Sequence, residues 1–306
     1  MKEFDLVIIG AGPAGLAAGI YAGRANLKTA IIEKLGPGGQ VMITDKIANY
    51  PGFPSEISGF ELGDALTQQA QKFGAQIVYD EIDSISQDGL YKIVKGKGDT
   101  YKAKTLIIAS GVRYKSIGIP GEKELRGRGV SYCATCDGPF FKDQPVVVIG
   151  GGDAAVEEGI YLTQFCSSVT IVHRRNEFRA APMLVDHAKA NPKIRFELEQ
   201  VAESINGTNS VESITLKNVK DGSQKTIPAN AVFIFIGYNA NTEFLEGFVK
   251  MTPEGWIITD EEMRTDKPGV FAAGDLRVKS VRQVVTAVAD GAIAAQNAWK
   301  WLEENK

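Results

Sequence analysis

The sequence predicts an α/β fold in which one βαβ unit occurs twice along 306 residues. A Gly-x-Gly-x-x-Gly pattern at 10–15 follows the apolar run 5–9, and a related pattern at 150–155 follows the apolar run 146–149. A helical segment and a second apolar run come next in both copies, at matching intervals. A strand, a glycine turn and a helix in this order are typical of nucleotide-binding units. We therefore expect two Rossmann-like three-layer nucleotide-binding domains.

The later elements of the two copies also correspond. Alternating apolar and polar residues predict hairpins, formed by 77–79 with 92–94 in the first copy and by 194–196 with 214–216 in the second. Each copy then ends on a buried-looking apolar strand that a glycine follows, at 106–111 and at 232–237. This repetition indicates duplication of one domain.

A further segment follows the second copy. It contains the apolar stretch 269–275 and a predicted long helix from about Val281 to Glu303. Because the second copy is complete without this segment, we assign it to the first copy. The second domain is then inserted into the first, and the expected domains are residues 1–113 with 241–306, and residues 114–240. Glycine, proline and polar residues near both crossings suit linkers.

Composition narrows the class of protein. A hydrophobic content of 44% and a charged content of 23% are those of an ordinary globular protein. The net charge of -3 favours neither nucleic acid nor an anionic membrane as partner. The first residues lack the apolar core of a signal peptide, and no apolar run approaches the roughly 20 residues that span a bilayer. Three cysteines, two of them close together, indicate a cytoplasmic protein with catalytic or metal-binding thiols.

The first glycine pattern has the context of a dinucleotide site. Gly10 permits the tight turn, Gly12 lets a pyrophosphate approach the backbone, and Gly15 allows close packing of helix on strand. The helix N-terminus faces the phosphates. Glu33 ends the next strand, 21 residues beyond Gly12, where it can accept hydrogen bonds from ribose hydroxyls. The alternative is a glycine-rich turn that binds nothing.

The second copy differs at the position that selects the dinucleotide. His173 stands where the first copy has Glu33, and three arginines follow it: Arg174, Arg175 and Arg179. Arginines bind a ribose 2′-phosphate in bidentate pairs, whereas an acid would repel it. The pattern favours NADPH over NADH. The alternatives are a solvated charge run for the arginines and, for His173, either a contact with the adenosine or an incidental surface position.

Cys133 and Cys136 have the spacing of a redox dithiol. Two intervening residues let the sulfurs meet within one helical turn, and a helix N-terminus lowers the pKa of the first thiol. A zinc site is the rival, but zinc needs four ligands, and only Cys166 and two histidines remain as soft donors. We therefore expect no metal, and we expect Cys166 to be a buried small hydrophobic residue.

Asp137 directly follows the second cysteine. Thiol–disulfide chemistry delivers a proton to a leaving thiolate, and no histidine lies nearby in sequence. Asp137 is therefore the local candidate for the general acid, if partial burial raises its pKa. The alternative is a turn or capping residue ahead of Gly138 and Pro139.

With these motifs the chain resembles the low-molecular-weight, bacterial-type thioredoxin reductases, which are FAD- and NAD(P)-dependent pyridine nucleotide-disulfide oxidoreductases. The resemblance covers essentially the whole chain. It rests on Cys-Ala-Thr-Cys-Asp-Gly at 133–138, His-Arg-Arg at 173–175, Gly-Gly-Gln at 38–40, Gly-Asp at 274–275 and Arg-Gln at 282–283. It implies FAD on the first domain, NADPH on the second, thioredoxin as partner and a homodimer.

The resemblance also implies which residues hold each cofactor. For FAD they are Gly10, Gly12, Pro13, Ala14, Gly15, Glu33, Gly39, Gln40, Asn49, Ala109, Gly111, Gly274, Asp275, Arg282 and Gln283. For NADPH they are Gly150, Gly152, Asp153, Ala154, His173, Arg174, Arg175 and Arg179.

The implied activity is NADPH-dependent reduction of thioredoxin. Hydride passes from NADPH to FAD, electrons then reduce the Cys133–Cys136 disulfide, and the dithiol exchanges with thioredoxin. Cys136 is the thiol next to the flavin, Cys133 attacks thioredoxin, and Asp137 is the acid. The alternative is a related flavin dithiol oxidoreductase that acts on another protein or on a small-molecule disulfide. The segment 276–279 departs from the family pattern near the flavin.

Overall fold

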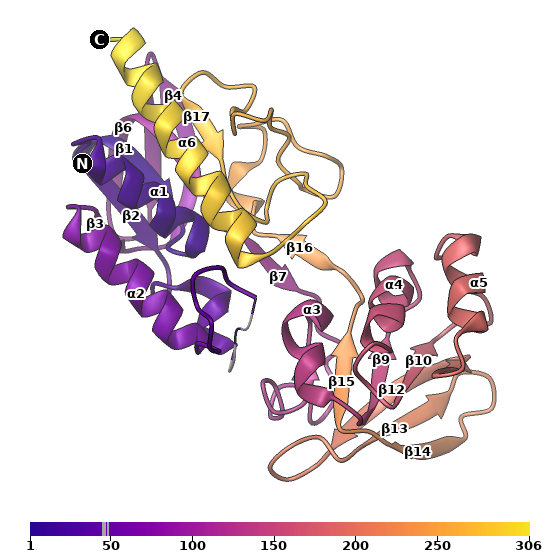
Figure 1. Ribbon diagram of the computed structural model, residues 1–306. Coiled ribbons are helices and arrows are strands. Elements are labelled where there is room, and N and C mark those ends of the chain that lie inside the picture. Colours follow the sequence, from indigo (N-terminus) through magenta and orange to yellow (C-terminus); the bar gives the residue numbers. More distant parts are fainter. Residues whose placement is uncertain (45–46, 48) are drawn as a thin grey trace. The chain divides into compact units, whose positions relative to one another are not determined.

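The computed structural model describes residues 1–44, 47 and 49–306 (Figure 1). The chain divides into two compact units, one formed by Met1–Arg113 with Asn239–Lys306 and the other by Tyr114–Tyr238. The boundaries expected from the sequence lie within two residues of this division. The two crossings of the chain pair with each other as a short two-stranded sheet of β7 (Val112–Tyr114) and β16 (Tyr238–Ala240).

The first unit is built on a seven-stranded sheet in the order β3-β2-β1-β6-β5-β4, with β17 paired to β6. Its parallel strands are β1 (Lys2–Ile9), β2 (Thr29–Glu33), β3 (Gln76–Tyr79), β6 (Thr100–Ile108) and β17 (Val270–Ala272). An antiparallel hairpin of β4 (Ile82–Asp88) and β5 (Tyr91–Gly96) pairs with the start of β6, whereas β17 pairs with its end.

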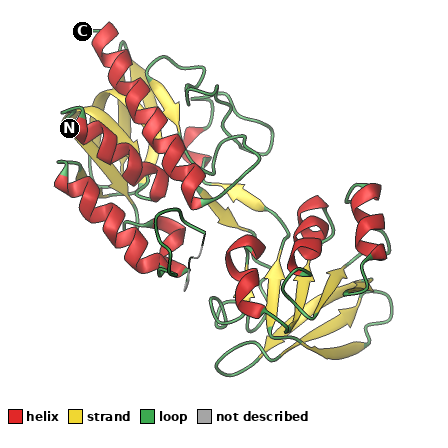
Figure 2. Cartoon of the chain, viewed as in Figure 1, coloured by secondary structure: helices red, strands yellow, loops and turns green. Residues whose placement is uncertain are grey.

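Helices cover one face of this sheet (Figures 1 and 2). They are α1 (Pro13–Arg24), α2 (Gly59–Lys72) and α6 (Val284–Glu304), with the short 3₁₀ turns η1 (Gly39–Ile43) and η3 (Glu243–Leu245) in the same unit. Alternate residues of β1 belong to different cores: Ile8 packs with the helices, and Val7 packs with the hairpin and the segment near Leu245. The period of two along the strand therefore produces two apolar layers. Gly291 lets α6 approach α1, since a Cβ there would lie 2.0 Å from the carbonyl oxygen of Ala14.

The second unit repeats the arrangement with fewer elements. Its parallel sheet has the order β11-β10-β9-β15-β8, and a three-stranded antiparallel sheet, β12-β13-β14, lies in the other layer. The parallel strands are β8 (Val130–Ser131), β9 (Pro145–Ile149), β10 (Ser168–His173), β11 (Ile194–Leu198) and β15 (Ala231–Ile234). The antiparallel strands are β12 (Gln200–Asn206), β13 (Ser213–Asn218) and β14 (Gln224–Pro228). The helices are α3 (Ala134–Asp137), α4 (Asp153–Leu162), α5 (Pro182–Ala190) and the 3₁₀ turn η2 (Gly138–Phe141).

The same alternation builds the two cores of this unit. Val148 packs toward the helices and Val147 toward the antiparallel sheet. The predicted fold class, α/β with two Rossmann-like three-layer units, is confirmed. Within the described residues, no helix is long and apolar enough to cross a membrane.

The expected hairpins are wrong in detail. Residues 77–79 lie in β3, which pairs in parallel with β2, and the partner of β5 is β4. Likewise, 194–196 lie in the parallel strand β11, and 214–216 form part of the middle strand of the antiparallel sheet. The missed strands β4 and β12 carry many polar residues because one side of each is exposed or half-exposed, so their apolar signal is weak.

Candidate functional site

The first glycine turn leaves open space at the start of α1. Gly10 adopts φ +103°, and a Cβ there would lie 2.4 Å from the carbonyl oxygen of Ala109, just after β6. A Cβ on Gly15 would lie 1.8 Å from the Gly10 carbonyl oxygen. A Cβ on Gly12, in contrast, would meet no described heavy atom within 4 Å. With no acid in the first turn of α1, this backbone suits a phosphate group.

Glu33 holds the same turn from the end of β2. Its Oε2 accepts a hydrogen bond from the backbone N–H of Ala11 at 2.8 Å, and its Oε1 accepts one from Leu35 at 3.0 Å. Each carboxylate oxygen has a second lone pair, so these bonds leave acceptor capacity for a ribose hydroxyl. Pro13 and Ala14, also predicted at the FAD site, form the first residues of α1.

The glycine-rich segment after β2 packs directly on the turn. The N–H of Gly38 donates to the carbonyl of Ala11 at 2.7 Å, and a Cβ on Gly39 would lie 2.8 Å from the Cα of Gly12. The side chain of Gln40 donates through Nε2 to the carbonyl of Val112. Its Oε1 is buried and has no hydrogen-bond partner among the described residues. An orphaned acceptor of this kind suits a donor from a bound group.

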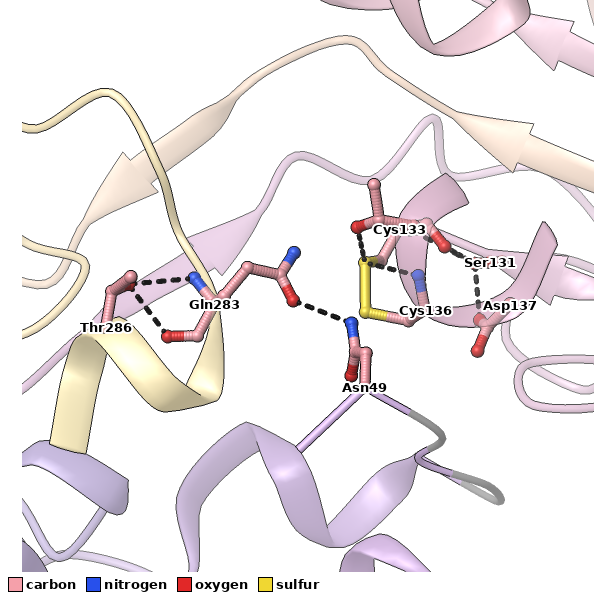
Figure 3. The surroundings of a disulfide bond; sticks show 8 residues. Asn49, Ser131, Cys133, Cys136, Asp137, Gln283 and Thr286 are labelled. Atoms are coloured by element: carbon pink, nitrogen blue, oxygen red, sulfur yellow. Dashed lines mark hydrogen bonds between the residues drawn. A yellow bond between two sulfur atoms is a disulfide. The ribbon is translucent and has the colours of Figure 1, made fainter. Parts of the chain in front are cut away.

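Asn49 and Gln283, two other predicted FAD residues, form a hydrogen bond within the first unit. The side-chain amide of Asn49 donates to Oε1 of Gln283 at 3.1 Å (Figure 3). Gln283 precedes α6, and its backbone N–H donates to the hydroxyl of Thr286 at 3.2 Å as part of a capping box. Ala109 and Gly111 follow β6, and a Cβ on Gly111, whose φ is +67°, would meet no described atom within 4 Å.

A loop after β17 supplies the last predicted FAD residues. The N–H of Gly274 donates to Asp290 in α6 at 3.0 Å. Arg282 donates through Nε to the carbonyl of Asp275 at 3.1 Å and lies over the ring of Trp256. Burial raises the pKa of Asp275 to about 6, and its Oδ1 is buried without a partner among the described residues.

These features of the first unit fit FAD. The open turn at Gly12 suits the pyrophosphate, and Glu33 suits the ribose hydroxyls. The unpartnered acceptors of Gln40 and Asp275 suit hydroxyl and N–H donors of the same ligand. All of the predicted FAD residues lie in this one unit.

The second glycine turn repeats the geometry of the first. A Cβ on Gly150 would lie 2.5 Å from the carbonyl oxygen of Phe235, and one on Gly152 would meet no described atom within 4 Å. Asp153 and Ala154 begin α4, and Oδ1 of Asp153 accepts from the N–H of Ala181 at 2.7 Å. The backbone at the start of α4 therefore also leaves space for a phosphate group, but unlike α1 this helix carries an acid, Asp153, in its first turn.

His173 lies beneath this turn, at the end of β10. It is buried, stacks on Phe178 with ring centroids 5.4 Å apart, and lies against Gly151, where a Cβ would be 2.1 Å from Nδ1. Burial lowers the pKa of His173, and the neighbouring arginines lower it further. His173 therefore supports the turn from within the fold, and it is not an incidental surface residue.

The three arginines lie on the surface around His173. Arg174, Arg175 and Arg179 are exposed, and none forms an ion pair with a described acid. The positive charges of all three lower the pKa of His173, so the three arginines lie close to one another around this residue. The N–H of Arg179 donates to the carbonyl of Gly151 at 2.7 Å, which ties this residue to the glycine turn. Guanidinium groups gathered beside an open turn fit the 2′-phosphate of NADPH.

The two cysteines form a disulfide, with Cα atoms 5.3 Å apart, at the start of the short helix α3 (Figure 3). Cys133 caps the helix, and its Sγ accepts from the N–H of Cys136 at 3.2 Å. Its Sγ also lies 3.4 Å from the hydroxyl oxygen of Thr135. Such donors favour a thiolate on Cys133 after reduction.

Cys166 is buried and forms no disulfide. Burial raises the pKa of its thiol to about 11, as expected for an inert residue.

Asp137 ends α3 and is held by a residue that the sequence did not single out. The hydroxyl of Ser131 lies 2.5 Å from Oδ2 of Asp137, and it also accepts from the N–H of Cys133 at 3.1 Å. Tyr132 is anchored as well, because its hydroxyl donates to the buried Glu122 at 2.7 Å. Serine and tyrosine before a cysteine carry no distinctive sequence signal, so only the structure identifies these supports.

Comparison with known proteins agrees with this site. The family model described as pyridine nucleotide-disulphide oxidoreductase matches residues 4–291. A protein of Peptoclostridium acidaminophilum named thioredoxin reductase is 49% identical over 99% of this chain and 98% of its own length. One of the same name from Bacillus subtilis is 48% identical over 99% of this chain and 96% of its own. A solved thioredoxin reductase structure from Streptococcus pyogenes is 47% identical, has a TM-score of 0.96 and aligns over 99% of each chain. The chain therefore belongs to the pyridine nucleotide-disulphide oxidoreductase family and is an oxidoreductase.

Proposed function

We propose that this chain is an NADPH-dependent thioredoxin-disulfide reductase that works with bound FAD. The observation that carries the proposal is the Cys133–Cys136 disulfide, placed at a helix start in a chain with two open glycine turns. The names of the relatives support thioredoxin as the substrate. FAD, when bound, supplies a redox centre that takes two electrons from NADPH and passes them to the disulfide.

The residues of the second unit select and orient NADPH. Gly152 leaves room for the pyrophosphate at the start of α4, and His173 supports the turn from below. Arg174, Arg175 and Arg179 bind the 2′-phosphate through charge-assisted hydrogen bonds.

The residues of the first unit hold the flavin nucleotide. Gln40 and Asp275 accept hydrogen bonds from it through their buried oxygens, and Glu33 binds its ribose. The backbone around Gly12 faces its pyrophosphate at the start of α1.

The dithiol chemistry follows from the groups around the sulfurs. Two electrons break the S–S bond and leave two thiolates, one of which takes a proton from Asp137. The thiolate of Cys133, stabilised by the N–H of Cys136, attacks one sulfur of the thioredoxin disulfide and displaces the other as a thiolate. Cys136 then attacks Cys133, which releases reduced thioredoxin and restores the original disulfide.

A coupled assay tests the activity. Purified protein is expected to be yellow and to lose its visible absorbance when NADPH is added. With thioredoxin and a chromogenic disulfide, NADPH oxidation is expected to depend on thioredoxin. Equal turnover of the chromogenic disulfide without thioredoxin would favour a small-molecule disulfide as substrate, and a colourless protein that binds no FAD would refute the proposal.

We further propose that the enzyme is cytoplasmic, as its cysteine content indicates, and works as a homodimer, as the resemblance implies. Light scattering of the holoenzyme tests the assembly, and a monomeric mass at working concentration would contradict it. Cell fractionation tests the location.

A further inference from the structure

We propose that Ser131 is a positioning residue for the thiol chemistry: its hydroxyl holds the carboxyl of Asp137 in place and ties it to the backbone of Cys133. The inference rests on the proposed function, because it concerns the acid of that reaction. Ser131 does not contact the sulfurs in any described hydrogen bond, so it acts through Asp137.

The position of Ser131 is set by the sheet. It ends β8, where it pairs with Phe233 of β15, and it is only 4% exposed. Two residues later Cys133 caps α3, and Asp137 is the last residue of that helix. β8 is the two-residue edge strand of the parallel sheet, and pairing with β15 together with burial holds the hydroxyl in place beside a very short helix. Helix α3 has only four residues, so it needs outside support to hold its last side chain in place.

The hydrogen bonds of the hydroxyl are determined by its chemistry. A serine has one proton to donate and two lone pairs. The N–H of Cys133 uses one lone pair at 3.1 Å. Two acceptors compete for the proton, Oδ2 of Asp137 at 2.5 Å and the carbonyl of Cys133 at 3.3 Å. The contact with Asp137 is the shorter of the two, so the hydroxyl donates its proton to Oδ2 of Asp137.

This arrangement has two consequences for the acid. With Oδ2 accepting from Ser131, the proton that Asp137 transfers is carried on Oδ1, so the carboxyl always presents the same oxygen for transfer. The bond also stabilises the ionised carboxylate that remains after the transfer. Ser131 therefore assists the step in which a thiolate is protonated.

The test compares Ser131→Ala and Ser131→Thr in the holoenzyme by rapid mixing across a pH series. Ser131→Ala is expected to slow reduction of the disulfide about tenfold. It is also expected to move the alkaline limb of the pH profile to higher pH, because the general acid must be protonated to act and its carboxylate loses a donor. Ser131→Thr keeps the hydroxyl and is expected to restore the profile. FAD content and the rate of flavin reduction by NADPH are expected to stay at wild-type values in both variants.

Two further variants distinguish a positioning role of Ser131 from a general effect of losing a buried hydroxyl. Thr163 lies just after the end of α4 in the same unit, and its buried hydroxyl donates to the carbonyl of Ile160. Thr163→Ala removes this hydroxyl and is expected to leave the pH profile unchanged. Asp137→Asn is expected to slow the same step by roughly 10²–10⁴-fold. If Asp137→Asn slows reduction of the disulfide while Ser131→Ala keeps the wild-type rate and pH profile, the positioning role of Ser131 is wrong and Asp137 remains the general acid. If Asp137→Asn is unchanged, the acid assignment itself fails.

Discussion

Arg277 and Asp290 form a two-point ion pair inside the first unit, with Nε 2.8 Å from Oδ2 and Nη2 3.1 Å from Oδ1. Lys279 adds a third contact, with Nζ 2.8 Å from Oδ2, and all three side chains are largely buried. The same carboxylate accepts from the N–H of Gly274. One residue of α6 therefore holds Gly274, Arg277 and Lys279, which flank Asp275 in this loop.

Asp290→Asn is expected to destabilise the protein by roughly 3–5 kcal/mol, because it leaves two buried cations without their carboxylate. Urea denaturation of the FAD-free protein measures the loss, and fluorescence titration is expected to show weaker FAD binding. Glu303→Gln serves as the control on the same helix. It removes an exposed pair with Lys306 and is expected to cost about 1 kcal/mol or less. Equal losses in the two variants would contradict the role of Asp290.

The same ion pair predicts a loss of stability in acid. Burial would raise the pKa of Asp290, but the hydrogen bonds from Arg277 and Lys279 outweigh it and hold the pKa below its ordinary value. The contribution is present above the pKa of the unfolded chain and is lost as pH falls through the folded pKa. Asp290→Asn is therefore expected to differ most from wild type at neutral pH and least at strongly acid pH. A difference that stays constant with pH would show that charge is not its cause.

Arg174→Ala combined with Arg175→Ala is expected to lower kcat/KM for NADPH by one to three powers of ten, since each charge-assisted bond contributes about 1.5–3 kcal/mol before screening. The value for NADH, which has no 2′-phosphate, is expected to change little. Steady-state kinetics with both dinucleotides measure the ratio. Arg195→Ala is the matched control, because Arg195 is an exposed arginine of the same unit on β11. Parallel loss with NADPH and NADH would exclude the phosphate contact.

Cys133→Ser is expected to keep flavin reduction by NADPH and to abolish thioredoxin reduction, because hydride transfer uses neither sulfur. Stopped-flow absorbance of the flavin and the coupled thioredoxin assay measure the two half-reactions. Cys166→Ala is the control and is expected to retain turnover, since its thiol is buried and its pKa is raised to about 11. Full turnover in Cys133→Ser would overturn the assignment of the dithiol.

Lys92 is expected to make the stability of the protein depend on pH in the alkaline range. Its side chain is 1% exposed, donates to the carbonyls of Leu90 and Lys104, and lies over the ring of Trp301. Burial lowers its pKa from 10.5 to about 8. Between these values the unfolded chain binds the proton more tightly than the folded one, so stability is expected to rise with pH.

Lys92→Met is expected to abolish this rise, which has a slope of at most about 1.4 kcal/mol per pH unit. Denaturant unfolding between about pH 7 and 11 measures it. Lys95→Met, which alters an exposed lysine of the same strand, is expected to keep the wild-type slope. If Lys92→Met keeps the rise as well, the source lies in another group.

The features that could be predicted from the sequence are those that depend on neighbouring residues. The turn at Gly10 and the helix predicted at 281–303, observed as Val284–Glu304, follow from short patterns of residue type. Ser131 and Asp290 were missed because their importance depends on partners distant in sequence or on burial. Asp290, for example, is an acid in a long helix, where most acids face water, and its partner Arg277 is 13 residues away. Contacts of this kind depend on tertiary packing, which no local pattern encodes.

Gly291 packs α6 closely against Ala14 of α1, so the first unit can complete its folding only late in synthesis on the ribosome. Helix α1 is among the first elements to emerge, but α6 and β17, which complete its unit, are among the last. Tyr114–Tyr238 is continuous, so it can fold as soon as it is released. During that interval the apolar faces of α1 and β6 remain uncovered, and they are surfaces that a chaperone can bind. Slowing translation after residue 238 is therefore expected to lengthen exposure of the first unit without affecting the second.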